Sequence, residues 1–157
     1  ASLAKMNPPL RSKADVSYLQ QALADGHIDA IATDHAPHEA SAKALPLGEA
    51  PFGIIGYPTL LPLALKFYHQ QKLSLNQIIA LLTYQPAEII GKPQLGRIKK
   101  GGIADLALIN LDLNWSLHAS EIYSKANNTP LLGENFKGKN LLTMVDGQIR
   151  YFNPADF

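Results

Sequence analysis

Hydrophobic positions near the start of the chain follow the spacing of a helix. A helix that begins after Ser12 has this residue as its N-cap and Asp15 as its capping-box partner. The sequence Ala24-Asp25-Gly26 predicts its end. Between these limits the apolar positions recur at three- and four-residue intervals and define one face of the helix: Val16, Leu19 and Leu23.

A short apolar run follows this helix. Residues 28–33 are apolar or β-branched apart from Asp29, which is typical of a buried strand. A helix joined to a buried strand by two or three residues indicates the alternation of a parallel sheet with helices on its faces. The first part of the chain therefore predicts an α/β fold.

A long loop and a group of helices come next. The loop, at about residues 35–57, is rich in Ala, Pro and Gly, and loops of this length in a compact domain are often functional. Three helices without intervening strands indicate that the alternating region ends near residue 92. Proline and capping signals predict these helices at Pro58 to about Gln71, at Ser74 (with Gln77 as its capping partner) to Leu82, and at Pro86 to Gly91.

The last third of the chain changes to short apolar runs separated by glycines. Ala104–Leu111 and Leu141–Val145 predict two strands. Asp146-Gly147 is a hairpin signal that leads into a third strand, Gln148–Phe152. The intervening residues 115–139 are expected to form a loop with one short helix, so the tail predicts a small β-domain.

Composition narrows the classes of function. The chain has 157 residues, 46% hydrophobic and 17% charged, as in an ordinary soluble globular protein, and its net charge of +1 offers no patch for nucleic acid or an anionic membrane. The absence of cysteine excludes disulfides and thiolate zinc sites. No apolar stretch approaches the roughly 20 residues that span a bilayer, and the first residues lack a signal-peptide pattern. We therefore expect a cytosolic protein.

Candidate chemistry is concentrated where the predicted strand ends. Asp34-His35-Ala36-Pro37-His38 supplies one carboxylate and two imidazoles, and α/β barrel enzymes hold their catalytic groups at this end of the strands. Asp34 could ligate a divalent metal and exchange a proton with metal-bound water, or simply cap a turn. Pro37 disfavours a continuous helix, so one imidazole can face the site while the other braces the loop. A metal site needs three or four ligands, more than this stretch supplies.

Four further positions are candidates for binding. His38 suits an anionic group of a substrate, or it is a buried, hydrogen-bonded histidine. Asn7 precedes two prolines and offers an amide on a stiff backbone, or opens a turn. Arg11 could bind a carboxylate or form a surface salt bridge. The loop around Phe52-Gly53 lacks the spacing of a P-loop or a Rossmann turn and better suits backbone contact with a small planar ligand.

Several motifs together resemble the C-terminal half of class I dihydroorotases, in the amidohydrolase superfamily. The resemblance implies the C-terminal part of a (β/α)8 TIM-type barrel over residues 1–92 and strands of an adjoining small β-sandwich over residues 93–157. One departure is Pro58, where the family commonly has glutamate. The matching stretches cover nearly all of the chain: residues 5–11 (Lys-Met-Asn-Pro-Pro-Leu-Arg), 32–38 (Ala-Thr-Asp-His-Ala-Pro-His), 52–56, 84–91, 101–106, and Asn128-Thr129-Pro130 with Gly133.

The resemblance also implies an activity and roles for individual residues. The family interconverts L-dihydroorotate and N-carbamoyl-L-aspartate in cytosolic pyrimidine biosynthesis and binds one or two Zn²⁺. By motif, the implied roles are metal ligand and general acid–base for Asp34; substrate contact for Asn7 and His38, the latter near the substrate carboxylate; backbone contact with the ring amide for Phe52 and Gly53; and support for His35 and Arg11.

Other residues that the family uses are missing from this sequence. The His-x-His pair, the bridging carboxylate or modified lysine and two later metal histidines belong to the N-terminal half of the family. We therefore expect the chain alone to be inactive and to need the missing N-terminal half or a homo-oligomer partner. Two alternatives remain: a non-catalytic dihydroorotase-like subunit that scaffolds aspartate transcarbamoylase, and another cyclic amidase such as a hydantoinase.

Overall fold

The chain forms two compact units that are interleaved in the sequence. The computed structural model describes residues 2–154. The first unit comprises Ala1–Asp25, Ala32–Leu60 and Ser116–Asn135, and the second comprises Gly26–Ile31, Leu61–Trp115 and Phe136–Phe157. The described helices include none with the length and apolarity of a membrane span.

The first unit consists mainly of loops with short helices. Its elements are the 3-10 helices η1 (Ser2–Ala4) and η2 (Ala119–Glu121) and the α-helices α1 (Lys13–Ala24) and α2 (Ala40–Lys43). The predicted capping box of α1 forms, and the helix ends at the predicted residue. Its predicted apolar face is largely open, because Leu23 is buried whereas Val16 and Leu19 remain 42% and 49% exposed.

The strand predicted over residues 28–33 does not form. This backbone has no regular secondary structure; the Ile31 N–H donates to the Leu81 carbonyl (3.1 Å), and His35 makes one parallel bridge with Ile54. A strand requires a ladder of partners along its length, and the described residues offer this segment only isolated ones. Residues 28–33 are half-buried or exposed and none is fully buried, so the apolar run predicted neither the burial nor the pairing of this segment correctly.

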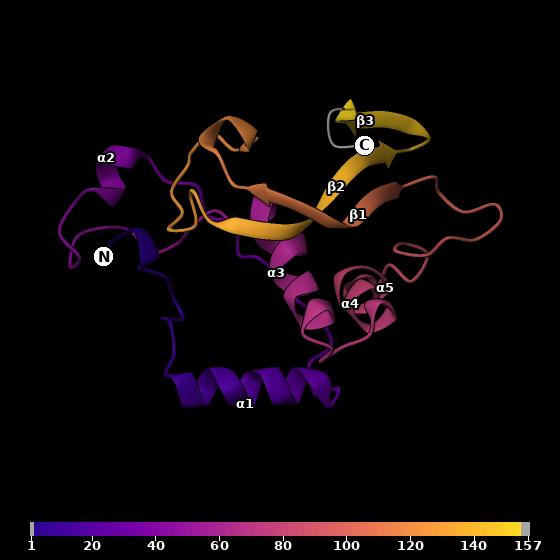
Figure 1. Cartoon of the computed structure of the whole chain (residues 1–157), viewed down its shortest axis with the longest axis horizontal. Coiled ribbons are helices and arrows are strands. Elements are labelled where there is room, and N and C mark those ends of the chain that lie inside the picture. Colours follow the sequence, from indigo (N-terminus) through magenta and orange to yellow (C-terminus); the bar gives the residue numbers. More distant parts are fainter. Residues whose placement is uncertain (1, 155–157) are drawn as a thin grey trace. The chain divides into compact units, whose positions relative to one another are not determined.

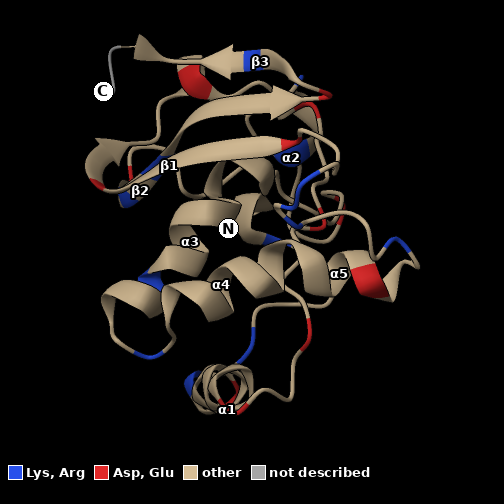
Figure 2. Ribbon diagram, turned by 90° about the vertical axis from the view of Figure 1, so that its right-hand side faces the viewer, with Lys and Arg blue, Asp and Glu red and all other residues tan. Residues whose placement is uncertain are grey.

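The three predicted helices are confirmed, with small shifts at their ends. They are α3 (Tyr57–His69), which begins in the first unit, α4 (Leu75–Leu82) and α5 (Tyr84–Ile89). The Ser74–Gln77 capping box forms as predicted. Helix α5 begins two residues before Pro86. Figure 2 shows how few charged residues these helices carry: α4 has no Lys, Arg, Asp or Glu, and α3 has only Lys66.

A three-stranded sheet completes the second unit. Strand β2 (Asn135–Val145) lies between β1 (Leu106–Ser116) and β3 (Gln148–Phe152), as Figure 1 shows, and β2 and β3 are antiparallel. Asp146 and Gly147 have φ of +50° and +72°, which confirms the predicted hairpin turn. Strands β1 and β2 extend into the region predicted as loop, where the Trp115 indole N–H of β1 donates to the Gly138 carbonyl of β2 (3.0 Å).

The two units have different interiors. Among the described residues, the buried hydrophobic side chains of the second unit are Ala64, Leu65, Leu73, Ile78, Ala80, Leu81, Ala87, Phe136 and Leu141. Those of the first unit are Leu23, Ala50, Ile55 and Leu117. The first unit also buries polar or charged residues: Lys43, Thr59, Asn128 and Thr129.

Candidate active site

Asp34, in the first unit, has a constrained backbone conformation and is exposed to solvent. Its φ of +44° is in the left-handed region, which L-residues avoid and which Asp tolerates better than most. Holding a non-glycine residue there costs on the order of 1–3 kcal/mol, and such residues cluster at functional sites. The bridge between His35 and Ile54 fixes the backbone immediately after it. The carboxylate is thus presented to solvent from a fixed position.

His35 braces the loop rather than facing a ligand. Its Nδ1 accepts hydrogen bonds from the N–H groups of Gly56 (3.1 Å) and Tyr57 (3.4 Å). The ring also stacks on Tyr57, with centroids 4.0 Å apart and planes 3° from parallel. Because Nδ1 accepts, the neutral ring carries its proton on Nε2 and has no lone pair left for a metal. This geometry agrees with a supporting role.

His38 is held at two points. Its backbone N–H donates to Asn128 Oδ1 (3.0 Å), and its ring Nε2 lies 2.8 Å from the Phe52 carbonyl oxygen. A carbonyl only accepts, so Nε2 carries a proton and Nδ1 is the nitrogen that remains for a ligand. In the imidazolium form Nδ1 also donates, which suits contact with a carboxylate.

Atoms of Ala36 and His38 lie so close to Gly53 that no residue with a side chain fits at this position. Its φ is +115°, and a Cβ atom would lie 2.5 Å from the Ala36 Cβ and 3.3 Å from His38 Nε2. Its N–H donates to the Lys5 carbonyl (2.9 Å). The structure therefore brings the Phe52-Gly53 backbone against the His38 ring, two predicted substrate contacts that are 14 residues apart in the sequence.

Asn128 was not predicted to have a role, yet its side chain joins three backbone segments. It is 4% exposed, and its Oδ1 accepts from the His38 N–H. Its Nδ2 donates to the carbonyls of Ala36 (3.0 Å) and Gly53 (3.3 Å). Its own carbonyl accepts from the Ile55 N–H (3.2 Å). The only signal in the sequence was its place in the Asn-Thr-Pro motif, which gave no function.

The sequence also gave no indication of a role for Lys43. It ends the short helix α2 and is 2% exposed. Its Nζ donates to the carbonyls of Pro51 (3.0 Å) and Gly53 (3.0 Å), with a longer contact to that of Lys5 (3.4 Å). Burial, and then the nearby charge of Lys5, hold the pKa of Lys43 below its ordinary value. A lysine in an Ala-rich segment gave no sequence signal of burial, because lysine is almost always exposed.

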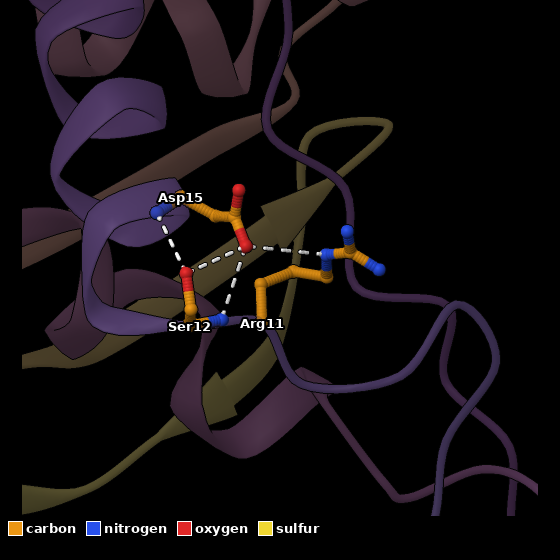
Figure 3. Close-up of polar contacts among 3 residues, drawn as sticks. All are labelled: Arg11, Ser12 and Asp15. Carbon is orange, nitrogen blue, oxygen red and sulfur yellow. Dashed lines mark hydrogen bonds and ion pairs between the residues drawn. The ribbon is translucent and has the colours of Figure 1, made fainter.

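Asn7 and Arg11 lie on the segment that follows Lys5. Asn7 is exposed and precedes a cis peptide bond to Pro8. The Arg11 Nε is 3.6 Å from Asp15 Oδ2, the same oxygen that accepts from Ser12 at the start of α1 (Figure 3). The structure thus places the Arg11 guanidinium beside a carboxylate of this chain, in an exposed pair.

These residues supply too few ligands to hold a metal ion by themselves. Within residues 2–154, no three His, Asp or Glu side chains come together in a group that could hold a metal ion. Asp34 offers one carboxylate and His35 offers no free lone pair, so this chain fits at most part of a zinc site. A cavity of about 600 Å³ opens nearby in the first unit, lined among others by His38, Glu39, Lys43, Lys125 and Asn128.

Comparison with known proteins gives consistent matches over almost the whole chain. Residues 6–150 match the model of the amidohydrolase family. The dihydroorotase of Ehrlichia chaffeensis (strain Arkansas) is 49% identical over 150 residues, which are 96% of this chain and 33% of the relative. The dihydroorotase of Geobacter sp. (strain M21) is 45% identical over 148 residues, 94% of this chain and 35% of the relative. The chain thus spans about a third of the length of these relatives.

Solved structures with the same fold include two hydantoinases. A D-hydantoinase structure superimposes with a TM-score of 0.88 at 22% identity, over 97% of this chain and 34% of that chain. An L-hydantoinase from Arthrobacter aurescens gives a TM-score of 0.87 at 31% identity, over 94% of this chain and 34% of that chain. These matches confirm the predicted α/β fold and the resemblance to part of an amidohydrolase.

Proposed function

The chain belongs to the amidohydrolase family, and from this premise we propose that it is the C-terminal third of a class I dihydroorotase. The complete enzyme would interconvert L-dihydroorotate and N-carbamoyl-L-aspartate in the cytosol. Identity of 49% to a dihydroorotase supports this substrate over others of the family. Residues 1–92 would belong to the barrel and residues 93–157 to the β-sandwich.

The observation that carries the proposal is the position of Asp34. It presents an exposed carboxylate from a left-handed backbone, two residues before Ala36, which packs against Gly53. We assign Asp34 the transfer of one proton. In hydrolysis the water oxygen bonds to the ring carbonyl carbon, Asp34 accepts its proton, and the carbon–nitrogen bond breaks. Asp34 then delivers the proton to the leaving nitrogen, as general acid–base catalysis of amide cleavage requires.

The loop cluster supplies the substrate contacts. The Nδ1 edge of His38 would bind the substrate carboxylate as an imidazolium, while the backbone at Phe52 and Gly53 would bind the ring amide. Asn7 lies two residues after Lys5, whose carbonyl holds Gly53, and its amide would contact the same substrate. His35 would brace the loop. Arg11, beside Asp15, would support the segment that carries Asn7.

The metal centre is only partly represented. Zn²⁺ bound near Asp34 would lower the pKa of its water to about 7. We propose that Asp34 is one ligand and that residues outside these 157 supply the others, from the remaining two thirds of the protein or from a second copy. Calorimetric titration of the isolated chain with Zn²⁺ is then expected to give no micromolar binding, and such binding would contradict the division of ligands.

The activity is tested on the full-length protein that contains this chain. We expect turnover of dihydroorotate and little of dihydrouracil. The reverse preference would favour a hydantoinase, whose fold the chain shares at TM-scores of 0.87 to 0.88. Absence of both activities, together with binding of aspartate transcarbamoylase, would favour a scaffolding subunit. As a complementary test, this chain should restore activity when it replaces the matching third of the Ehrlichia chaffeensis enzyme.

A further inference from the structure

We propose that Lys43 is a positioning residue of this site, and that its buried ammonium sets the direction of the peptide groups of Pro51, Phe52 and Gly53. This inference rests on the proposed function in one respect, because those groups are the ones assigned to the substrate. It goes beyond that function by assigning a task to a residue that touches neither substrate nor metal.

The surroundings of Lys43 are unusual for a lysine. Its Nζ is enclosed by the carbonyl oxygens of Lys5, Pro51 and Gly53, and only 2% of the residue is exposed. The ion pairs among residues 2–154 do not include it. Burying a charge without a counter-ion is costly unless dipoles compensate it. An ammonium kept here at such a cost indicates that its three donors have a specific task.

The geometry of the peptide bond shows which other backbone groups these hydrogen bonds orient. In a trans peptide the C=O and N–H groups point in opposite directions. Because the Pro51 carbonyl points to Lys43, the Phe52 N–H of the same peptide points away from it. That N–H has no hydrogen-bond partner among the described residues. The next carbonyl, of Phe52, accepts from His38 Nε2. Lys43 thus orients a free donor and holds the peptide groups on both sides of the Phe52–Gly53 peptide, whose carbonyl holds the His38 ring.

Lys5, on the N-terminal segment, is a second lysine whose ammonium binds carbonyls of the same loop. Its Nζ donates to the carbonyls of Ala50 (2.6 Å) and Gly48 (3.3 Å) and lies 4.5 Å from the centre of the Phe52 ring. These carbonyls precede the substrate-facing peptides. Lys43 therefore differs from Lys5 in the segment that it holds, which is the segment carrying Phe52 and Gly53.

The test uses the full-length protein with three variants. Lys43→Met removes the ammonium and keeps similar volume, Lys43→Arg keeps the charge and donors, and Lys125→Met is a control on an exposed lysine that lines the same cavity. Thermal melting first establishes which variants fold. Steady-state kinetics with dihydroorotate and amide hydrogen exchange of residues 51–56 then follow.

We expect Lys43→Met to raise KM about tenfold, the factor of one hydrogen bond, with a smaller change in kcat. Amide exchange of residues 51–56 should accelerate in the same variant. Lys43→Arg should give an intermediate KM, and Lys125→Met should match the wild type in both measurements. A folded Lys43→Met protein with unchanged KM and unchanged exchange would overturn the proposal.

Two other outcomes are also decisive. If the wild type does not turn over dihydroorotate, the proposed function fails while the exchange measurement still tests Lys43: accelerated exchange in Lys43→Met alone supports it, and equal exchange contradicts it. If Lys43→Met does not fold, Lys43→Gln, which keeps two donors without charge, replaces it. Its KM and exchange are then compared with those of Lys43→Arg by the same criteria.

Discussion

The two units of this chain are stabilised in different ways. Among the described residues, the nine buried side chains of the second unit are all apolar, whereas four of the eight buried side chains of the first unit are polar or charged. The second unit combines helices and a sheet with an apolar interior. The first unit orders a long loop through individual bonds from Lys43, Asn128 and His35 to backbone groups. A hydrophobic interior tolerates exchange of similar side chains, but these polar contacts each depend on one residue.

The largest expected effect is the loss of catalysis without loss of stability. Asp34→Asn keeps the shape of the side chain and its tolerance of the left-handed backbone, but it cannot accept a proton. In the full-length enzyme kcat should fall by about 10²–10⁴-fold, while the thermal midpoint stays within error of the wild type. Asp29→Asn, at an exposed aspartate nearby in sequence, is the control. An active Asp34→Asn enzyme would contradict the assignment of proton transfer to Asp34.

The opposite behaviour is expected in the second unit. Leu65 is completely buried, so Leu65→Ala should lower the free energy of unfolding by about 2–5 kcal/mol through lost burial and a residual cavity. The KM for dihydroorotate should stay unchanged in the protein that remains folded. Urea denaturation and kinetics measure the two quantities. A raised KM would show that the two units do not separate stability from binding.

Substitution of Asn128 should lower stability and weaken substrate binding together, each by a smaller amount. Asn128→Ala removes the partner of the His38 N–H and of two carbonyls, and we expect a loss of about 1–3 kcal/mol in unfolding free energy. Because the same bonds fix His38 and Gly53, KM should rise as well. The neighbouring exposed residue gives the matched control, Asn127→Ala. If the two variants behave alike, Asn128 has no special part in ordering the loop.

Two equivalent capping boxes allow a direct comparison of the units. Ser12→Ala and Ser74→Ala each remove an N-cap side chain that accepts from the residue three positions on, a change worth about 1 kcal/mol. Helix α4 buries Ile78, Ala80 and Leu81, so the loss at Ser74 should appear in global unfolding. Helix α1 buries only Leu23 among its residues, so the loss at Ser12 should appear as faster amide exchange within the helix. Equal global effects would contradict this distinction.

The smallest expected effect is a pH dependence. Burial holds the pKa of Lys43 below its ordinary value of 10.5, so between the two values the unfolded chain binds more protons than the folded one. Stability contributed by this group therefore rises with pH through that window. The difference in unfolding free energy between the wild type and Lys43→Met should shift in favour of the wild type as the pH rises from neutral towards 10.5, the ordinary pKa of lysine. A constant difference would show that Lys43 ionises normally.

The sequence predicted the regular elements better than the loop to which we assign the chemistry. The capping boxes at Ser12 and Ser74 and the turn at Asp146-Gly147 are local signals, and the structure has all three. The strand at residues 28–33 failed because pairing depends on a neighbour that the local pattern does not encode. The proximity of His38 and Phe52-Gly53 was expected only from the family resemblance. The roles of Lys43 and Asn128 were not predicted, because their side-chain bonds to the backbone join residues 8 to 92 positions apart.

The crowding around Gly53 limits how this site can be diversified. A side chain at this position would collide with the Ala36 Cβ at 2.5 Å and would also have to adopt a φ of +115°. Mutant libraries that randomise Gly53 would therefore consist almost entirely of misfolded or displaced loops. The adjacent Phe52 side chain is 54% exposed, so its replacement leaves the backbone in place. Altered selectivity should be sought at Phe52, with Gly53 left invariant.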